Sequence, residues 1–171
     1  MAILEVQIND SPVAVAGGAD FDVLVLGIIG ATNGMTASVQ LNGSTRNSDE
    51  QLNWFYANLR SGDKVRAVLR ENGAGTPPSR RRDYTERESN APHQVSDKSS
   101  ICSFDVRFGR QEARTSADME STLYATATWR HNVNYLEFEV WCTAADDPNQ
   151  NRYWHRVTID YDVPVVIEVS F

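Results

Sequence analysis

Apolar and polar residues alternate along much of the chain, and this pattern predicts β-strands separated by turns. Residues 2–8 alternate most cleanly. Residues 21–29 form a nearly continuous apolar run, which is typical of a strand covered on both faces. Further strands are expected at residues 36–41, 49–58, 64–71, 101–108, 122–130, 135–141, 153–160 and 163–170. With no convincing long helix, the pattern predicts an all-β sandwich or barrel.

Two stretches are also compatible with a helix. Residues 49–58 follow a Ser48 that resembles the start of a helical capping box, and residues 112–130 place Met119, Leu123 and Ala127 at helical spacing. In the first stretch Leu52, Trp54 and Tyr56 alternate, and in the second the threonines and Trp129 disfavour a helix. We therefore predict a strand over 49–58 and over the second part of 112–130.

The same order of parts occurs twice, one hundred residues apart. This offset places Trp54 on Trp154 and superimposes alternating apolar residues in several segments. The matched pairs are Leu4–Phe104, Val6–Val106, Ile8–Phe108, Val23–Leu123, Val25–Ala125, Ile29–Trp129, Leu59–Ile159, Val65–Val165, Ala67–Ile167 and Leu69–Val169. Alternating strands can align by accident, but we favour a duplication. It predicts two pseudo-symmetric repeats of about five antiparallel strands each.

A long polar stretch separates the repeats. Residues 72–100 contain several glycines and prolines and the basic run Arg80-Arg81-Arg82, with few apolar residues. Loops of this length are uncommon inside a compact domain. We predict a first β repeat over residues 1–71, a long polar linker over 72–100 and a second β repeat over 101–171. The repeats are compatible with one merged core or with two separate cores.

Composition narrows the classes of partner. The chain has 171 residues, of which 41% are hydrophobic and 23% charged, and these are ordinary globular values. A net charge of −7 disfavours nucleic acid and anionic membranes, which need a concentrated positive field, and mildly favours a basic protein partner. The N-terminus lacks the parts of a secretory signal, and no apolar run approaches the ~20 residues that cross a bilayer. We expect a cytoplasmic protein.

Motifs for catalysis or metal binding are missing from the sequence. The histidines have no zinc-ligand spacing, and no nucleophile or phosphate-binding motif occurs. Acidic residues at 146–147 and 160–162 lack the dense spacing of a calcium loop. Cys102 and Cys142 are expected to be free buried thiols, with a disulfide between them as the alternative. We predict no enzyme, no cofactor and no metal.

Part of the first repeat resembles a group of known proteins. Residues 49–71 have the spacing Asp49-Glu50-x-Leu52-x-Trp54, Leu59-x-x-Gly62-Asp63-x-Val65 and Glu71. This spacing resembles small uncharacterised bacterial β-proteins that carry E-x-L-x-W, then L-x-x-G-D-x-V and a closing glutamate. The second repeat departs from it, with no Gly-Asp before Val165 and with Arg152 in place of leucine. The resemblance implies a bacterial β-module and no chemistry.

Large rings occupy consecutive positions in Trp54-Phe55-Tyr56 and Tyr153-Trp154-His155. Because strand side chains alternate between faces, each run puts rings on both faces. One face is expected in the core. The other face forms either an interface between the repeats or a surface for a partner. In the second repeat, Arg152 and Arg156 are expected to flank Trp154 on one face.

These features favour a non-enzymatic protein-binding module of bacterial origin, with an immunity-like or accessory role. Its predicted binding residues are Trp54, Tyr56, Arg152, Trp154 and Arg156. The alternative is a β-sandwich that binds a carbohydrate or small ligand by stacking on tryptophan or tyrosine. A hydrolase that uses carboxylates and histidine is a third, less favoured hypothesis. A homodimer is compatible with all three.

Overall fold

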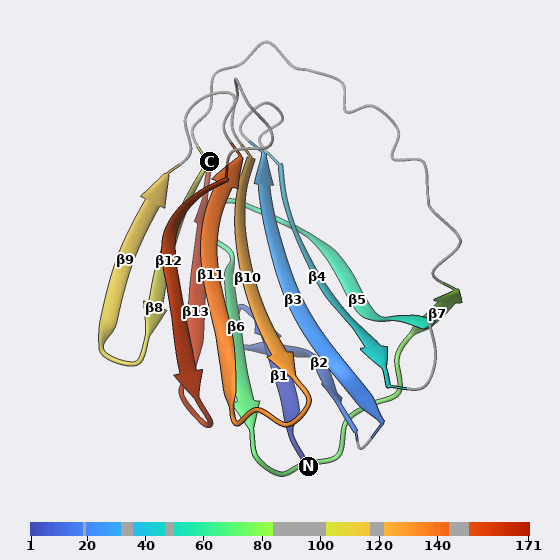
Figure 1. Ribbon diagram of the computed structural model, residues 1–171. Helices are drawn as coiled ribbons and strands as arrows, with labels where there is room; N and C mark the ends of the chain where they lie inside the picture. Colours follow the sequence, from blue (N-terminus) through green and yellow to red (C-terminus); the bar gives the residue numbers. More distant parts are fainter. Residues whose placement is uncertain (19, 32–35, 47–49, 84–101, 117–121, 144–150) are drawn as a thin grey trace.

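The computed structural model describes residues 1–18, 20–31, 36–46, 50–83, 102–116, 122–143 and 151–171 (Figure 1). These ranges contain thirteen strands and no helix. The strands are β1 (Ile3–Ile8), β2 (Ser11–Gly17), β3 (Phe21–Ala31), β4 (Thr36–Thr45), β5 (Glu50–Leu59), β6 (Lys64–Arg70), β7 (Arg80–Asp83), β8 (Ser103–Phe108), β9 (Gln111–Ser116), β10 (Thr122–Arg130), β11 (Tyr135–Thr143), β12 (Asn151–Asp160) and β13 (Val165–Ser170).

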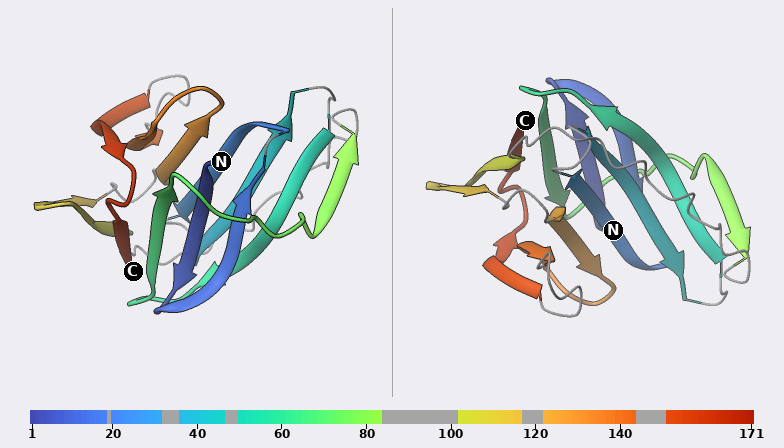
Figure 2. Two further views of the ribbon diagram at one scale, coloured as in Figure 1. Left: turned by 90° about the horizontal axis from the view of Figure 1, so that it is seen from below. Right: turned by 90° about the horizontal axis from the view of Figure 1, so that it is seen from above.

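The strands form two antiparallel sheets that pack as a sandwich (Figures 1 and 2). Sheet A has the order β2-β1-β6-β13-β8-β9, and sheet B has the order β12-β11-β10-β3-β4-β5-β7. Apart from β7, both orders are symmetric, so β1–β6 and β8–β13 occupy equivalent places. The predicted all-β architecture of two roughly symmetric halves is confirmed, as an open sandwich rather than a barrel. The duplication itself stays a prediction.

The two halves share one core. Strand β6 pairs with β13 in sheet A, and β3 pairs with β10 in sheet B, so each sheet runs through both halves. Inward-facing residues of both sheets are almost fully buried between them, as packing of two apolar faces requires. The largest of these side chains are Phe104, Phe138, Leu4, Leu24, Leu26, Ile28, Leu41, Leu52, Leu69, Leu123, Leu136 and Ile167.

Two turns show how closely the halves correspond. The amide of Gly62 donates to the carbonyl of Val169 at 2.7 Å, and the amide of Asp162 donates to the carbonyl of Leu69 at 2.8 Å. The two donors are one hundred residues apart in the chain, and so are the two acceptors, as the sequence offset predicts. Each turn, which links sheet B to sheet A in its own half, is thereby anchored to the other half.

The number of strands differs from the prediction, because each half has six rather than about five. The missed strands are β2 and β9, which form the two outer edges of sheet A. An edge strand has one neighbour and more solvent-exposed positions, so its sequence need not alternate cleanly. The polar sequence of β9, Gln111–Ser116, shows this directly.

The apolar run in β3 was misassigned. Only one face of β3 lies in the core, through Leu24, Leu26 and Ile28, whereas Val23 and Ile29 are half-buried on the outer face of sheet B. The β3–β4 pairing matches the β10–β11 pairing when residues of the two halves are compared at an offset of 99, rather than the 100 used in the sequence comparison. Matching outward-facing Val23, Val25 and Ile29 to the inward-facing Leu123, Ala125 and Trp129 was therefore wrong by one residue.

The predicted linker contains a strand. Residues 72–83 lie along the sandwich, and the basic run Arg80–Asp83 forms β7, which pairs with β5. This part of the predicted linker is therefore not loop throughout. Residues 84–100 of the linker lie outside the described residues.

Candidate binding surface

Strand β5 carries a buried tryptophan at a β-bulge. Leu41 of β4 pairs with Phe55, and the next residue of β4 pairs with Asn53, so Trp54 is the extra residue of the bulge. Its side chain is only 6% exposed and meets the ring of Phe21 edge to face, with the ring centroids 5.3 Å apart. Trp54, one of the predicted binding residues, therefore belongs to the core.

Residues 73–83, which we call the cap, cover Trp54. They cross from β6 in sheet A to β7 in sheet B (Figure 2). The amide of Thr76 donates to the carbonyl of Val15 in β2 at 2.7 Å, and the indole Nε1 of Trp54 donates to the carbonyl of Thr76 at 2.8 Å. The Ser79 hydroxyl donates to the carbonyl of Asn53 at 2.9 Å. The cap thus ties the edges of both sheets together in the first half.

Strand β12 has the same bulge without such a cover. Val140 pairs with His155 and Trp141 pairs with Tyr153, so Trp154 is the extra residue. The side chain of Trp154 is 38% exposed. Among the described residues, no strand pairs with the outer edge of β12, and Trp154 has no hydrogen-bond partner for its indole.

Aromatic rings form a row on the outer face of sheet B next to this edge. Tyr153, Trp141 and Tyr124 are direct neighbours on β12, β11 and β10. The rings of Tyr124 and Trp141 stack at 4.1 Å with an interplanar angle of 12°, and the rings of Trp141 and Tyr153 are 6.3 Å apart. Tyr153 is 55% exposed. The row ends at Tyr153, and Trp154 follows Tyr153 along the same edge strand. We call these four residues the β12 surface: Tyr124, Trp141, Tyr153 and Trp154.

An open hollow of about 520 Å³ borders β12 on the side facing sheet A. It brings together residues of β8, β9, β11 and β12, and the ring of Phe108 at its wall lies 6.2 Å from that of His155. Its lining residues are Phe108, Gln111, Glu137, Arg156, Val157 and Thr158. The hollow lies beside Arg156, Val157 and Thr158, on the C-terminal side of Trp154 along β12.

The structure separates the predicted binding residues. Tyr56 is 65% exposed, but it lies on β5, five strand positions from β12 and therefore roughly 24 Å away across the sheet. Arg156 lies on β12, where its guanidinium contacts Glu139 at 2.8 Å. Arg156 pairs with Glu139 on the outer face, and the bulge interrupts alternation between Arg156 and Arg152. The strict alternation that the prediction assumed therefore does not run through this part of β12.

The aromatic runs do not form the interface between the halves, which was one of the two predicted readings. That interface is made by β3 with β10 and by β6 with β13, at the centres of the sheets. Strands β5 and β12 lie toward the opposite ends of sheet B. The exposed rings of the two runs are Tyr56 in the first half and Tyr153 and Trp154 in the second.

Sequence reasoning missed Trp141 and Tyr124 as members of this surface. Both stand at outward positions of alternating strands, in YLEFEVWCT and TLYATATWR, where polar residues are expected. A large ring at a solvent-facing position is the signal that could have identified them. Their direct pairing was not visible, because it depends on the register between β10 and β11.

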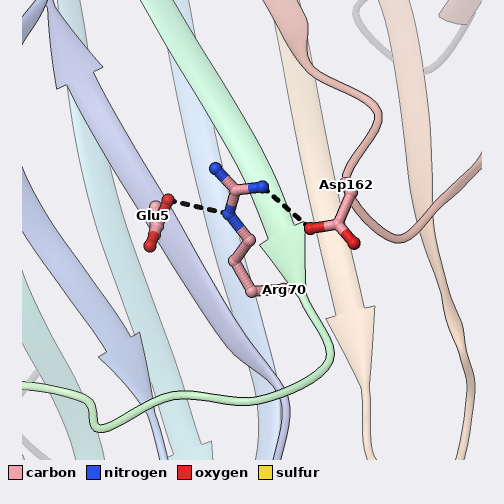
Figure 3. A network of polar contacts seen from close by, with 3 residues as sticks. All are labelled: Glu5, Arg70 and Asp162. Atoms are coloured by element: carbon pink, nitrogen blue, oxygen red, sulfur yellow. Dashed lines mark hydrogen bonds and ion pairs between the residues drawn. The ribbon is translucent and has the colours of Figure 1, made fainter.

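Several charged side chains on the outer face of sheet A form ion pairs. Arg70 bridges Glu5 of β1 and Asp162 of the β12–β13 turn, with N–O distances of 3.0 and 2.8 Å (Figure 3). Hydrogen bonds to Asp162 and then to Glu5 raise the pKa of the guanidinium above its usual value. The network joins the first half to the second.

The two cysteines are buried and are not joined by a disulfide bond, as predicted. Burial raises the pKa of Cys102 to about 11. The Cys102 thiol is therefore protonated at neutral pH. No group of three or more metal-ligating side chains occurs in the described ranges, and Asp146 and Asp147 lie outside them.

Comparisons with known proteins add no relative. No protein-family model matches the chain, and neither the curated proteins nor the solved structures gave a match. In the part of the chain that the structure describes, no helix is long and apolar enough to cross a membrane.

Proposed function

We propose that this chain is a non-enzymatic protein-binding module and that the β12 surface is its binding site. The observation that carries the proposal is the exposure of Tyr153 and Trp154 on β12, whose outer edge has no paired strand among the described residues. Exposed apolar patches usually mark interaction sites, and tryptophan, tyrosine and arginine carry much of the energy of protein interfaces.

The surroundings suit a protein interface. The stacked pair of Tyr124 and Trp141 lies beside Tyr153 on the same face of sheet B and extends the aromatic surface inward from the edge. Arg156 and Glu139 supply a charged rim beside it. The net charge of −7 favours a partner with a basic surface around the contact. An accessory or immunity-like role in a bacterium is consistent with these properties.

Ring geometry weighs against the carbohydrate alternative. Sugar binding by stacking needs exposed ring faces, but the faces of Tyr124 and Trp141 cover each other at an interplanar angle of 12°. Tyr153 is more exposed and offers one ring, at the end of the row. Titration with a glycan panel should leave the intrinsic fluorescence unchanged, and a saturable change that Tyr153→Ala removes would favour a sugar-binding function.

The proposal is tested by affinity capture from the lysate of the source organism. The bait is compared with Tyr153→Ala, Trp154→Ala and the control Tyr56→Ala, which removes an equally large exposed ring from the other end of sheet B. We expect a stoichiometric protein partner with the unchanged chain and with Tyr56→Ala, and its loss with the two β12 variants. A partner retained by both folded β12 variants would place the site elsewhere.

A further inference from the structure

We propose that Arg66 and Arg107, on the outer face of sheet A, form a binding site for a single phosphate group. The two arginines lie on β6 and β8, on either side of Val166 in β13. This site lies on the sheet opposite the β12 surface. The inference therefore goes beyond the proposed function, and neither depends on the other.

The strand register places the two arginines in one row. Val166 pairs with Arg66 on one side and with Arg107 on the other. The residues that precede and follow each of these three in its strand are buried in the core, so all three side chains point outward. Neighbouring strands lie roughly 4.8 Å apart, so the Cα atoms of the two arginines are about 10 Å apart. Two arginine side chains can bridge that distance, so their guanidinium groups can meet above Val166.

These two arginines differ from the other cations of the same strands. Each of the others contacts a carboxylate at 3.5 Å or less: Lys64 with Glu168, Arg70 with Glu5, and Arg114 with Asp105. Within the described ranges, neither Arg66 nor Arg107 has an ion pair or a hydrogen-bond partner for its guanidinium group. Two full positive charges are therefore left beside each other without a counter-ion from the described chain.

Charge and geometry fit a phosphate group best. Planar guanidinium groups donate paired hydrogen bonds to the oxygens of phosphates and carboxylates. A phosphate monoester carries close to two negative charges at pH 7, which matches the two arginines, whereas a carboxylate carries only one. Between the arginines, the partly buried side chain of Val166 offers an apolar contact to the carbon atoms of a phosphate ester.

Acidic residues around the pair limit the ligand to one phosphate. Glu112 pairs with Arg107 in the β8–β9 ladder without an ion pair between the side chains, and the directly paired Glu168 and Asp105 lie two residues farther along the strands on the same face. Together with Arg107 they line an open hollow of about 410 Å³. A polyanion such as nucleic acid would bring further phosphates against these carboxylates. The site therefore suits free phosphate or a monoester.

Titration of the full chain with inorganic phosphate, phenyl phosphate and acetate tests the site. Binding is followed through the backbone and guanidinium N–H signals at low ionic strength, where exposed charges are least screened. We expect both phosphates to shift the signals of Arg66, Val166 and Arg107 in a saturable way. Acetate should bind at least about fivefold more weakly, because it carries one charge rather than about two. Tighter binding of phenyl phosphate would assign the site to a monoester, and equal binding of the two phosphates would assign it to free phosphate.

Four variants, each checked for folding by urea unfolding, decide the result. Arg66→Gln and Arg107→Gln should each weaken phosphate binding at least about tenfold, since each removes a charged hydrogen-bond donor. The control Arg130→Gln removes the same charge from an exposed arginine of sheet B and should leave binding unchanged. Glu112→Gln should strengthen binding about two- to threefold, because it removes the carboxylate paired with Arg107.

Three results would overturn the site. They are no saturable shift with either phosphate, equal binding of acetate, and a loss in Arg130→Gln as large as in the other two arginine variants, which would indicate only a general attraction of anions. Lysate capture that depends on Tyr153 and Trp154 would in each case leave the proposed function standing, because the β12 surface lies on the other sheet.

Discussion

Strands β5 and β12 carry a tryptophan at the same bulge of the same sheet, but the two side chains differ in environment. Trp54 is 6% exposed and donates a hydrogen bond to Thr76, whereas Trp154 is 38% exposed. The cap accounts for the difference, because it covers the first edge and no described segment covers the second. Burial of an edge residue thus depends on the segment that crosses the edge as much as on the strand itself.

Replacing each tryptophan with alanine tests this comparison most strongly. Trp54→Ala removes a core side chain and should lower the free energy of unfolding by about 3–5 kcal/mol. Trp154→Ala removes a side chain that is already partly exposed to water, and it should lower the free energy of unfolding by about 1–2 kcal/mol. Urea unfolding measures both values, and similar losses in the two variants would show that the edges do not differ in energy.

A smaller effect is expected from two glycines of the cap. A Cβ added at Gly75 would lie 2.2 Å from the backbone carbonyl oxygen of Gly17, whereas one added at Gly73 would meet the side chain of Ile3. The backbone of Gly17 cannot move aside as the methyl group of a side chain can. Gly75→Ala should therefore lower the free energy of unfolding by about 1–3 kcal/mol, and Gly73→Ala should lower it less. Gly75→Ala should also make Trp54 fluorescence more accessible to acrylamide.

The two variants serve as matched controls for each other, since both add one methyl group to the same segment. If Gly75→Ala leaves both stability and quenching unchanged, the cap is not held against β2 as described, and the contrast between Trp54 and Trp154 loses its explanation.

Much of the fold was predictable from the sequence because one face of each central strand is buried. Alternation of Leu4, Val6 and Ile8 identifies β1, and the same pattern in residues 104–108 identifies its counterpart β8. The edge strands β2 and β9 were missed because partial exposure relaxes this alternation. The cap was missed because its burial of Trp54 is achieved by single hydrogen bonds and close backbone contacts, which leave no periodic pattern.

The candidate surface was only partly predictable. The ring pair Tyr153-Trp154 is visible in the sequence, but its exposure depends on which edges are covered. The contributions of Trp141 and Tyr124 depend on strand register, which brings residues from three strands into one row. Single-strand periodicity cannot supply that information. The bulge also changed the expected relation between Arg152 and Arg156, because an extra residue shifts alternation by one position.

A substitution in the β5–β6 turn tests the comparison between the halves through a smaller change in the free energy of unfolding. Gly62 has φ = 90° and no atom within 4 Å of an added Cβ, and the equivalent Asp162 has φ = 64°. Asparagine tolerates this region of backbone conformation, so Gly62→Asn should cost under about 1 kcal/mol, whereas β-branched Gly62→Val should cost clearly more. Equal losses in urea unfolding would show that conformation at this turn does not limit stability.

The smallest effect concerns Asp63, whose counterpart in the second half is Val163. The Arg60 amide donates to the Asp63 carboxylate at 2.7 Å and Asn9 donates at 2.8 Å, and these bonds lower the pKa of Asp63 below 3.8. A carboxyl group with a lowered folded-state pKa stabilises the protein above its unfolded pKa, and this contribution disappears as the pH falls through the folded value.

Asp63→Asn should therefore lower stability at pH 7 by under about 1 kcal/mol, because water screens this exposed group. The difference from the unchanged chain should shrink below about pH 4, where the carboxyl group of the unfolded chain becomes protonated. Urea midpoints at pH 7 and pH 3 measure it, with Asp162→Asn as an exposed carboxylate control that loses a pair to Arg70 instead. A difference that grows on acidification would show that Asp63 does not stabilise its turn as a charged acceptor, and that the two turns are held by backbone hydrogen bonds alone.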